Sequence, residues 1–132
     1  MNPVISTFFQ NYGLLPDFDA FRAAQRDLML HDVHIESRDH RGWQVLDGVD
    51  AYVESVREWS QFYGNSDDRG FEPTLDDGTD VEVKVTGTIV FRKPIAGVSR
   101  IADSDHDWRE HFVLREGRIA SARIDMGIEK LT

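Results

Sequence analysis

The chain contains no cysteine, so it can form no disulfide, no thiolate nucleophile and no Cys-ligated zinc site. It also lacks any apolar run approaching the ~20 residues of a membrane-spanning helix. Its first residues, MNPVISTFFQNYG, have neither the basic start nor the small-residue cleavage site of a secretory signal. We therefore expect a cytoplasmic protein that is not bound to a membrane.

Basic residues are scarce: 15 Lys and Arg stand against 24 Asp and Glu, giving a formal net charge of -9. A surface of this sign repels phosphate backbones and anionic lipids, so we expect neither nucleic acid nor membrane as a partner. The hydrophobic content of 40% is enough for a packed core. At this length, the chain is expected to form a single domain over residues 1–132.

Helical periodicity dominates the first half of the chain. Apolar residues between Val4 and Tyr12 recur along one stripe of a predicted helix that ends near Gly13. Asp17 or Asp19 can cap a second helix that runs to about residue 28. A third helix follows Gly48 and presents one apolar face as far as residue 63.

Strand patterns follow and surround these helices. Residues 31–37 alternate with Val33 and Ile35 on one face, 38–42 is predicted to be a turn, and Trp43 begins a short strand.

After residue 70 a period of two governs the rest of the chain. It predicts one long strand over 81–91 with a bend at Gly87, then a connection over 93–106 that is either a lid or a hairpin extension. Two further strands over 108–116 and 118–128 complete a hairpin. The expected class is α+β, with helices in front of a curled antiparallel sheet and an apolar pocket between them.

The most informative residue is Glu110. Strand alternation puts it on the same face as Trp108 and Phe112, while Arg109 and His111 point the other way. Desolvation would raise the pKa of a carboxyl in such a wall, so that it could stay protonated as a hydrogen-bond donor or general acid. The alternative is that Glu110 lies at the cavity mouth, either solvated or paired with an arginine. The facing strand would add an apolar row: Ala120, Ala122, Ile124, Met126 and Ile128.

Aromatic residues suit a flat hydrophobic ligand, with phenol and indole groups providing a few directional hydrogen bonds. They are Tyr12, Trp43, Tyr52, Trp59, Tyr63 and Trp108. Plain core packing is the alternative for the set on the third helix.

Metal binding is not expected, and neither is a cofactor. His31 and His34 would lie on opposite faces of a strand, and the acidic segment 103–107 lacks the glycine and terminal glutamate of a calcium loop. On the outer sheet face, His111 beside Arg123 and Asp125 could form a polar cluster that is open to solvent or covered by a second subunit.

The order of elements resembles the NTF2-like superfamily, and its SnoaL-like and ketosteroid-isomerase-like branch in particular. The resemblance rests on Pro16–Phe21 opening the second helix, Asp32–Ser37 as the strand, Gly48 before the third helix, and His111–Ile119. It implies a cystatin-like architecture, in which a curved antiparallel sheet and three helices of the N-terminal half form a cone-shaped pocket. It also implies a homodimer that covers one sheet face.

In the isomerase-like members, a strand carboxylate moves the proton while a tyrosine and a protonated acid hold the oxyanion. By motif, the protonated acid falls on Glu110. The base position falls on Ser37 and the tyrosine position on Phe9, which lack the required groups, although Tyr12 one turn on could supply a phenol. The superfamily's epoxide hydrolases carry an aspartate on the last strand where this chain has Ile124.

We therefore expect a pocket protein for a hydrophobic cyclic small molecule, acting as a cofactor-independent isomerase, cyclase or dehydratase. The predicted catalytic residues are Glu110 and Tyr12. The predicted ligand-binding residues are Phe9, Ile35, Ser37, Trp43, Tyr52, Trp59, Tyr63, Trp108, Phe112, Ile124 and Met126. The alternative is a non-catalytic ligand-binding or assembly module of the same fold.

Overall fold

The computed structural model describes all residues from Met1 to Thr132. The helices are α1 (Pro3–Gln10), α2 (Phe18–Leu28) and α3 (Val49–Phe62), with short 3₁₀ helices η1 (Asn11–Leu14) and η2 (Asp103–Asp105). The strands are β1 (Met29–Asp39), β2 (Gly42–Asp47), β3 (Gly70–Asp76), β4 (Asp80–Thr86), β5 (Ile89–Ile95), β6 (Val98–Ile101), β7 (Trp108–Arg115) and β8 (Arg118–Asp125).

All three predicted helices are present, and two of them begin at side-chain caps. The Asn2 side chain accepts a hydrogen bond from the backbone N–H of Val4 at 2.9 Å. Asp17, rather than Asp19, caps α2 by accepting from the N–H of Ala20 at 3.1 Å. Even the 14 residues of α3 do not provide the length and apolar character that a helical membrane span needs.

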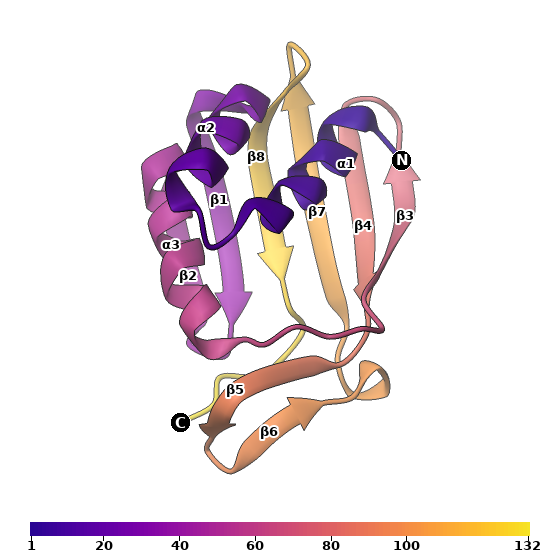
Figure 1. The fold of residues 1–132 in the computed structure, drawn as a ribbon. Helices are drawn as coiled ribbons and strands as arrows, with labels where there is room; N and C mark the ends of the chain where they lie inside the picture. Colours follow the sequence, from indigo (N-terminus) through magenta and orange to yellow (C-terminus); the bar gives the residue numbers. More distant parts are fainter.

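The main sheet has the strand order β2-β1-β8-β7-β4-β3, with the helices lying across one side of it (Figure 1). Its neighbours run antiparallel except for β1 and β8, which pair in parallel. Parallel neighbours need a long connection, and these two strands are separated by α3 and the strands that follow it. The α+β class and the curved sheet are confirmed, and the sheet is mostly, not wholly, antiparallel.

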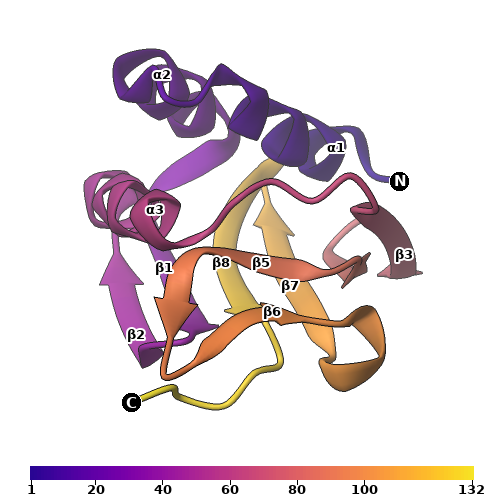
Figure 2. The same ribbon diagram turned by 60° about the horizontal axis from the view of Figure 1, so that its bottom comes forward.

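The predicted long strand over 81–91 is divided at Gly87 between two sheets. Gly87 has φ +112°, and a Cβ there would lie 2.9 Å from the carbonyl oxygen of Asp68. Beyond it, β5 leaves the main sheet and pairs with β6 at one end of the molecule (Figure 2), and its Phe91 also forms an isolated bridge with Tyr63. The connection over 93–106 is therefore a hairpin extension followed by η2. Asp103 accepts from the Gly87 N–H at 2.8 Å, and His106 Nε2 contacts the Gly87 carbonyl oxygen at 2.7 Å.

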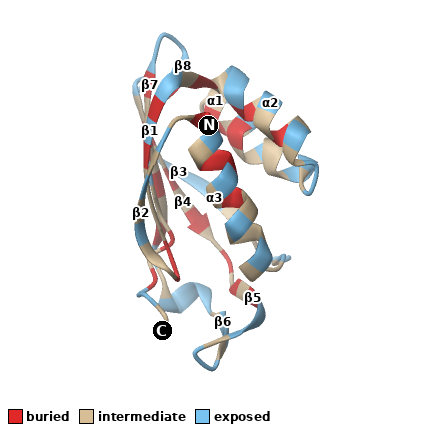
Figure 3. Ribbon diagram, turned by 90° about the vertical axis from the view of Figure 1, so that its left-hand side faces the viewer, coloured by how far each residue is buried: buried red, intermediate tan, exposed pale blue.

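The buried residues gather between the helices and the inner face of the sheet, whereas the outer surfaces are exposed (Figure 3). The main core joins all three helices to the sheet: Ile5, Phe8, Phe21, Met29, Val33, Ile35, Val49, Tyr52, Val53, Val56, Val81, Val83, Phe112, Leu114, Ile119 and Ala122. A second cluster lies toward β5: Tyr63, Val85, Ile89, Phe91, Trp108, Met126 and Ile128.

Two local expectations were wrong. The predicted turn over 38–42 starts later, because β1 continues to Asp39, and both Asp39 and His40 are buried. In β8 a register shift pairs Leu114 with Ile119, so Ile119 rather than Ala120 enters the core.

Candidate functional site

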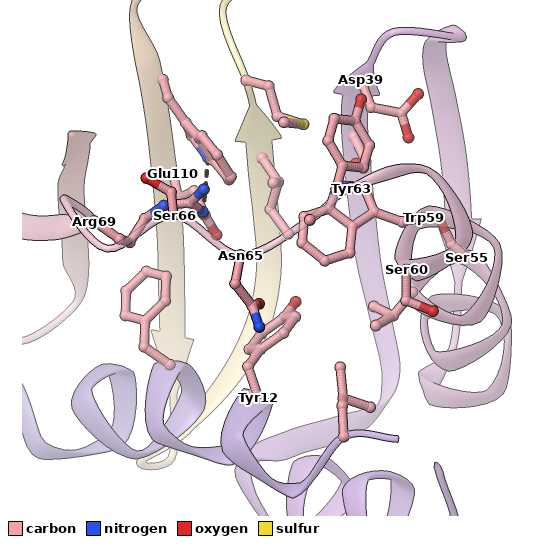
Figure 4. Close-up of a pocket in the computed structure, with 18 of the residues that line it drawn as sticks. Tyr12, Asp39, Ser55, Trp59, Ser60, Tyr63, Asn65, Ser66, Arg69 and Glu110 are labelled. Carbon is pink, nitrogen blue, oxygen red and sulfur yellow. Dashed lines mark hydrogen bonds between the residues drawn. The ribbon is translucent and has the colours of Figure 1, made fainter. Parts of the chain in front are cut away.

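A cavity of about 740 Å³ lies between the helices, the inner face of the sheet and the loop over 64–69. Most residues predicted to act on or bind a ligand line it: Phe9, Tyr12, Ser37, Tyr52, Trp59, Tyr63, Trp108, Glu110, Ile124 and Met126. Figure 4 shows Arg69, Ser66 and Glu110 on one side of this space, Tyr63, Trp59 and Ser60 on the other, and Tyr12 between them.

Three residues predicted to line the pocket lie elsewhere. Ile35 and Phe112 are fully buried in the main core, beneath side chains of the helices. Trp43 is 45% exposed, because its pairing with Arg38 turns both side chains to the outer face of the sheet. There the guanidinium of Arg123 lies 4.3 Å from the Trp43 ring centroid.

Glu110 enters the cavity from β7, between Val83 of β4 and Ile124 of β8. It is only 4% exposed, which rules out the solvated alternative, and the predicted inward orientation is confirmed. Burial raises the pKa of its carboxyl to about 7, although the Trp108 hydrogen bond and the charge of Arg69 act in the opposite direction. Trp108 Nε1 donates to Glu110 Oε2 at 3.0 Å. Near neutral pH, both protonation states of this carboxyl are therefore populated.

Two phenols meet on the helical side of the cavity. The hydroxyl oxygens of Tyr12 and Tyr52 are 2.6 Å apart, and Gln25 Nε2 donates to the Tyr52 oxygen at 3.1 Å. Gln25 is itself held in place, because its Oε1 accepts from Asn11 at 2.8 Å. Burial, and next the negative charge of Glu110, raise the pKa of Tyr12, so both phenols stay protonated at physiological pH.

A second carboxylate, Asp39, also borders the cavity, two residues beyond Ser37 on the same face of β1. Both of its oxygens are engaged by Arg41. Nη2 of Arg41 donates to Asp39 Oδ2 at 2.6 Å, and the backbone N–H of Arg41 donates to Oδ1 at 2.8 Å. Nη1 of Arg41 also forms an ion pair with Glu58 Oε2 at 2.7 Å, so Asp39 belongs to a chain of ion pairs.

Tyr63 forms the far wall and is fixed at both ends. Its ring stacks on Trp59 with centroids 4.9 Å apart. Its hydroxyl accepts from the backbone N–H of His40 at 3.1 Å and lies 2.7 Å from His40 Nδ1. Because the hydroxyl has one proton to donate, the geometry favours Nδ1 as its acceptor. Burial lowers the pKa of His40, which is consistent with a neutral ring.

Arg69 comes from the loop that closes the Glu110 side. Its guanidinium carbon lies 4.6 Å from the Trp108 ring centroid, and its buried Nε has no hydrogen-bond partner. The loop is fastened by Gly64, whose N–H donates to the Val90 carbonyl at 2.8 Å. It is also fastened by Asp68, which accepts from the N–H and hydroxyl of Thr88 at 3.0 and 2.9 Å. Ser66 also donates to Asp68, and these bonds lower the pKa of Asp68 to about 2.

The predicted polar cluster on the outer face is divided among separate pairs. His111 contacts Asp80 at 2.9 Å rather than Asp125. Asp125 is bound by Arg38 at 2.6 Å, and Arg123 pairs with Glu36 at 2.9 Å. These residues face away from the cavity.

Comparison with solved structures shows that the chain has the NTF2-like fold. An NTF2-like protein of unknown function from Burkholderia pseudomallei matches with a TM-score of 0.64 and 12% identity, covering 92% of this chain and 86% of that one. A proposed polyketide cyclase from Sinorhizobium meliloti matches with a TM-score of 0.61 and 18% identity, covering 94% of each chain. A proposed SnoaL-like polyketide cyclase from Mesorhizobium loti matches with a TM-score of 0.61 and 13% identity over 91% of this chain and 97% of that one. No protein-family model and no curated protein matches the sequence.

Sequence reasoning missed several polar residues of the site, among them Asp39, Arg69 and Gln25. Asp39 was within reach, since the alternation of Val33, Ile35 and Ser37 leads directly to it. Gln25 lies on the inward side of α2, one position after Ala24. Because it is polar, the apolar periodicity that marks buried helix positions does not identify it. Arg69 stands in a polar loop, and no local pattern indicates which way its side chain points.

Proposed function

We propose that the cavity binds a hydrophobic cyclic small molecule and that Glu110 performs cofactor-independent proton transfer on it. The reaction class is that of an isomerase, cyclase or dehydratase. The observation that carries this proposal is a buried carboxyl, with a pKa raised to about 7, that enters the cavity between the apolar residues Val83 and Ile124 of the neighbouring strands. A group with this pKa can donate a proton as an acid and take it back as a base near neutral pH.

Tyr12 is the proposed hydrogen-bond donor to the substrate oxygen on which negative charge develops. Gln25 already donates to the Tyr52 oxygen, so the Tyr52 proton has Tyr12 as its acceptor. The Tyr12 proton is then free to point into the cavity. A protonated phenol in a water-poor site stabilises an enolate oxygen without giving up its proton completely.

Asp39 is the other carboxylate of the cavity, yet Arg41 engages both of its oxygens. This arrangement supports Glu110 as the group that moves the proton. It is also the observation that favours the alternative function, a non-catalytic ligand-binding or assembly module, because the cavity then holds no second free base.

The decisive test is Glu110→Gln, assayed on a panel of cyclic β,γ-unsaturated ketones by the absorbance of the conjugated product. We expect the wild type to turn over a member of the panel, and the variant to lose about 10²- to 10⁴-fold in kcat. Calorimetric affinity for that ketone should change much less than kcat. Glu82→Gln is the matched control, because Glu82 lies on the adjacent strand but outside the cavity lining.

Unchanged turnover in Glu110→Gln would remove the acid role. Binding without turnover of any panel member, in wild type and variant alike, would support the non-catalytic module.

We further propose that two copies associate through the outer face of the sheet. Trp43 and Val45 are 45% and 63% exposed there, and positive and negative side chains lie around them in pairs. A twofold contact can match such a mixed surface with itself. Sedimentation or light scattering at micromolar concentration tests this proposal, and a monomeric mass would refute it.

A further inference from the structure

The charged side chains that line the cavity differ in their balance of charge from the chain as a whole, whose net charge is negative. They are Asp39, Arg69, Arg92 and Glu110. Asp39 forms an ion pair with Arg41. Burial raises the pKa of Glu110, so that part of the Glu110 population is protonated and uncharged near neutral pH. Neither Arg69 nor Arg92 takes part in an ion pair, whereas the chain as a whole carries -9. The cavity lining thus contains two arginines without an ion-pair partner, in a protein of negative net charge.

Arg69 is held in an orientation that leaves its donors unused. Its chain neighbour Asp68 is fixed by Thr88, and the guanidinium lies over the Trp108 ring. The Nε atom is buried and makes no hydrogen bond. The guanidinium also lines the cavity and is partly desolvated, so an anionic acceptor supplied by a ligand would gain more here than at a solvated arginine.

Glu110 stands beside this guanidinium without bonding to it. The two side chains influence each other's charge, yet no ion pair joins them, and the only hydrogen bond to the Glu110 carboxyl comes from Trp108. A protonated Glu110 offers a second donor on the same side of the cavity (Figure 4). Two donors on one side of the cavity match the two oxygens of a carboxylate.

We propose that the ligand is a hydrophobic cyclic acid whose carboxylate binds between Arg69 and Glu110. This inference rests on the proposed ligand-binding function of the cavity and names the chemical class of the ligand. Arg69 receives the anionic charge through its planar guanidinium, and Glu110 donates its proton to the second oxygen. Arg92, whose Nε is held by the Ser60 carbonyl at 2.9 Å, adds positive charge at the exposed edge.

The test compares a charged probe with its neutral isostere. Anthracene-2-carboxylate and anthracene-2-carboxamide are titrated into the full chain by calorimetry at pH 6, where most Glu110 is protonated. We expect the carboxylate to bind about tenfold more tightly than the amide, as a charge-assisted hydrogen bond would give. Arg69→Gln should abolish that preference and leave the amide affinity within about twofold. Arg100→Gln, the same charge change on exposed β6, should alter neither affinity.

The outcomes separate this inference from the proposed function. Equal binding of both probes to the wild type overturns the carboxylate site and leaves an apolar ligand cavity intact. This comparison needs no variant, so it holds even if Arg69→Gln fails to fold. Equal weakening of both probes by Arg69→Gln would mean that Arg69 only packs against Trp108, and also overturns the inference. Binding of neither probe overturns the carboxylate site together with the ligand cavity.

Discussion

Charged side chains are stabilised differently on the two faces of the main sheet. β7 sends Glu110 to the inner face and its chain neighbours Arg109 and His111 to the outer face. Outside, Arg109 pairs with Asp107 at 3.0 Å and His111 with Asp80 at 2.9 Å, both in partial contact with water. Inside, Glu110 has no ionic partner, and burial changes its pKa instead. Neighbouring residues of one strand thus show that a charge is accommodated either by a partner and solvent, or by protonation.

The largest effect should come from removing an inner-face side chain. Phe112→Ala should lower the free energy of unfolding by about 3–5 kcal/mol, because Phe112 is fully buried against Phe8, with ring centroids 5.0 Å apart. Val45→Ala on the exposed outer face should change it by about 0.5 kcal/mol or less. Chemical denaturation measures both values. A large cost at Val45 would contradict the comparison for an isolated chain and would point to an outer face covered by the second subunit.

The next effect is the pH dependence of stability that Glu110 creates. Its pKa rises from 4.5 when unfolded to about 7 when folded, so the folded chain holds the proton more tightly. This stabilisation is complete below pH 4.5 and is lost as the pH rises through 7. The shift corresponds to roughly 3 kcal/mol.

Denaturation curves of wild type and Glu110→Gln between pH 4.5 and 8.5 isolate this contribution. Subtracting one profile from the other cancels the contributions of other titrating groups to the stability. These include Arg69, Tyr12 and Tyr52, which face Glu110 and stay protonated over that range. Parallel stability profiles for the two proteins would show that Glu110 is not desolvated as described.

The smallest effect should come from an outer-face ion pair. Arg123 and Glu36 lie 2.9 Å apart with side chains 59% and 43% exposed. At protein concentrations where the chain is monomeric, a double-mutant cycle with Arg123→Ala and Glu36→Ala should give a coupling of about 1 kcal/mol or less, because water screens the pair. Added salt should reduce it further. A coupling of about 2 kcal/mol or more would show that this pair is shielded from solvent.

The parts of the molecule that could be predicted are those that depend on local periodicity. The three helices follow from apolar stripes, and the inward orientation of Glu110 follows from alternation within one strand. The parallel pairing of β1 with β8 could not be read in this way, because nothing in either segment specifies a neighbour so distant along the chain.

The unpredicted residues of the site depend on contacts between segments. Asp39 was assigned to a turn because charged residues and Gly42 dominate its surroundings, whereas pairing with Gly42 of β2 extends β1 through it. The orientation of Arg69 is set by Asp68 and Thr88, which are 20 residues apart in the chain. Trp43 was assigned to the cavity for its chemistry, although register with Arg38 sends it outward.

Gly87 does not line the cavity that holds Glu110 and has no functional group, yet the loop bearing Arg69 depends on it. A methyl group at this position would meet the backbone of Asp68 and Arg69 within 2.9 to 3.1 Å, at a φ of +112° that other residues rarely adopt. The loop would have to shift outward and take the guanidinium with it. A random-mutagenesis screen for impaired ligand uptake should therefore recover substitutions at Gly87, a position that no search for reactive side chains would select.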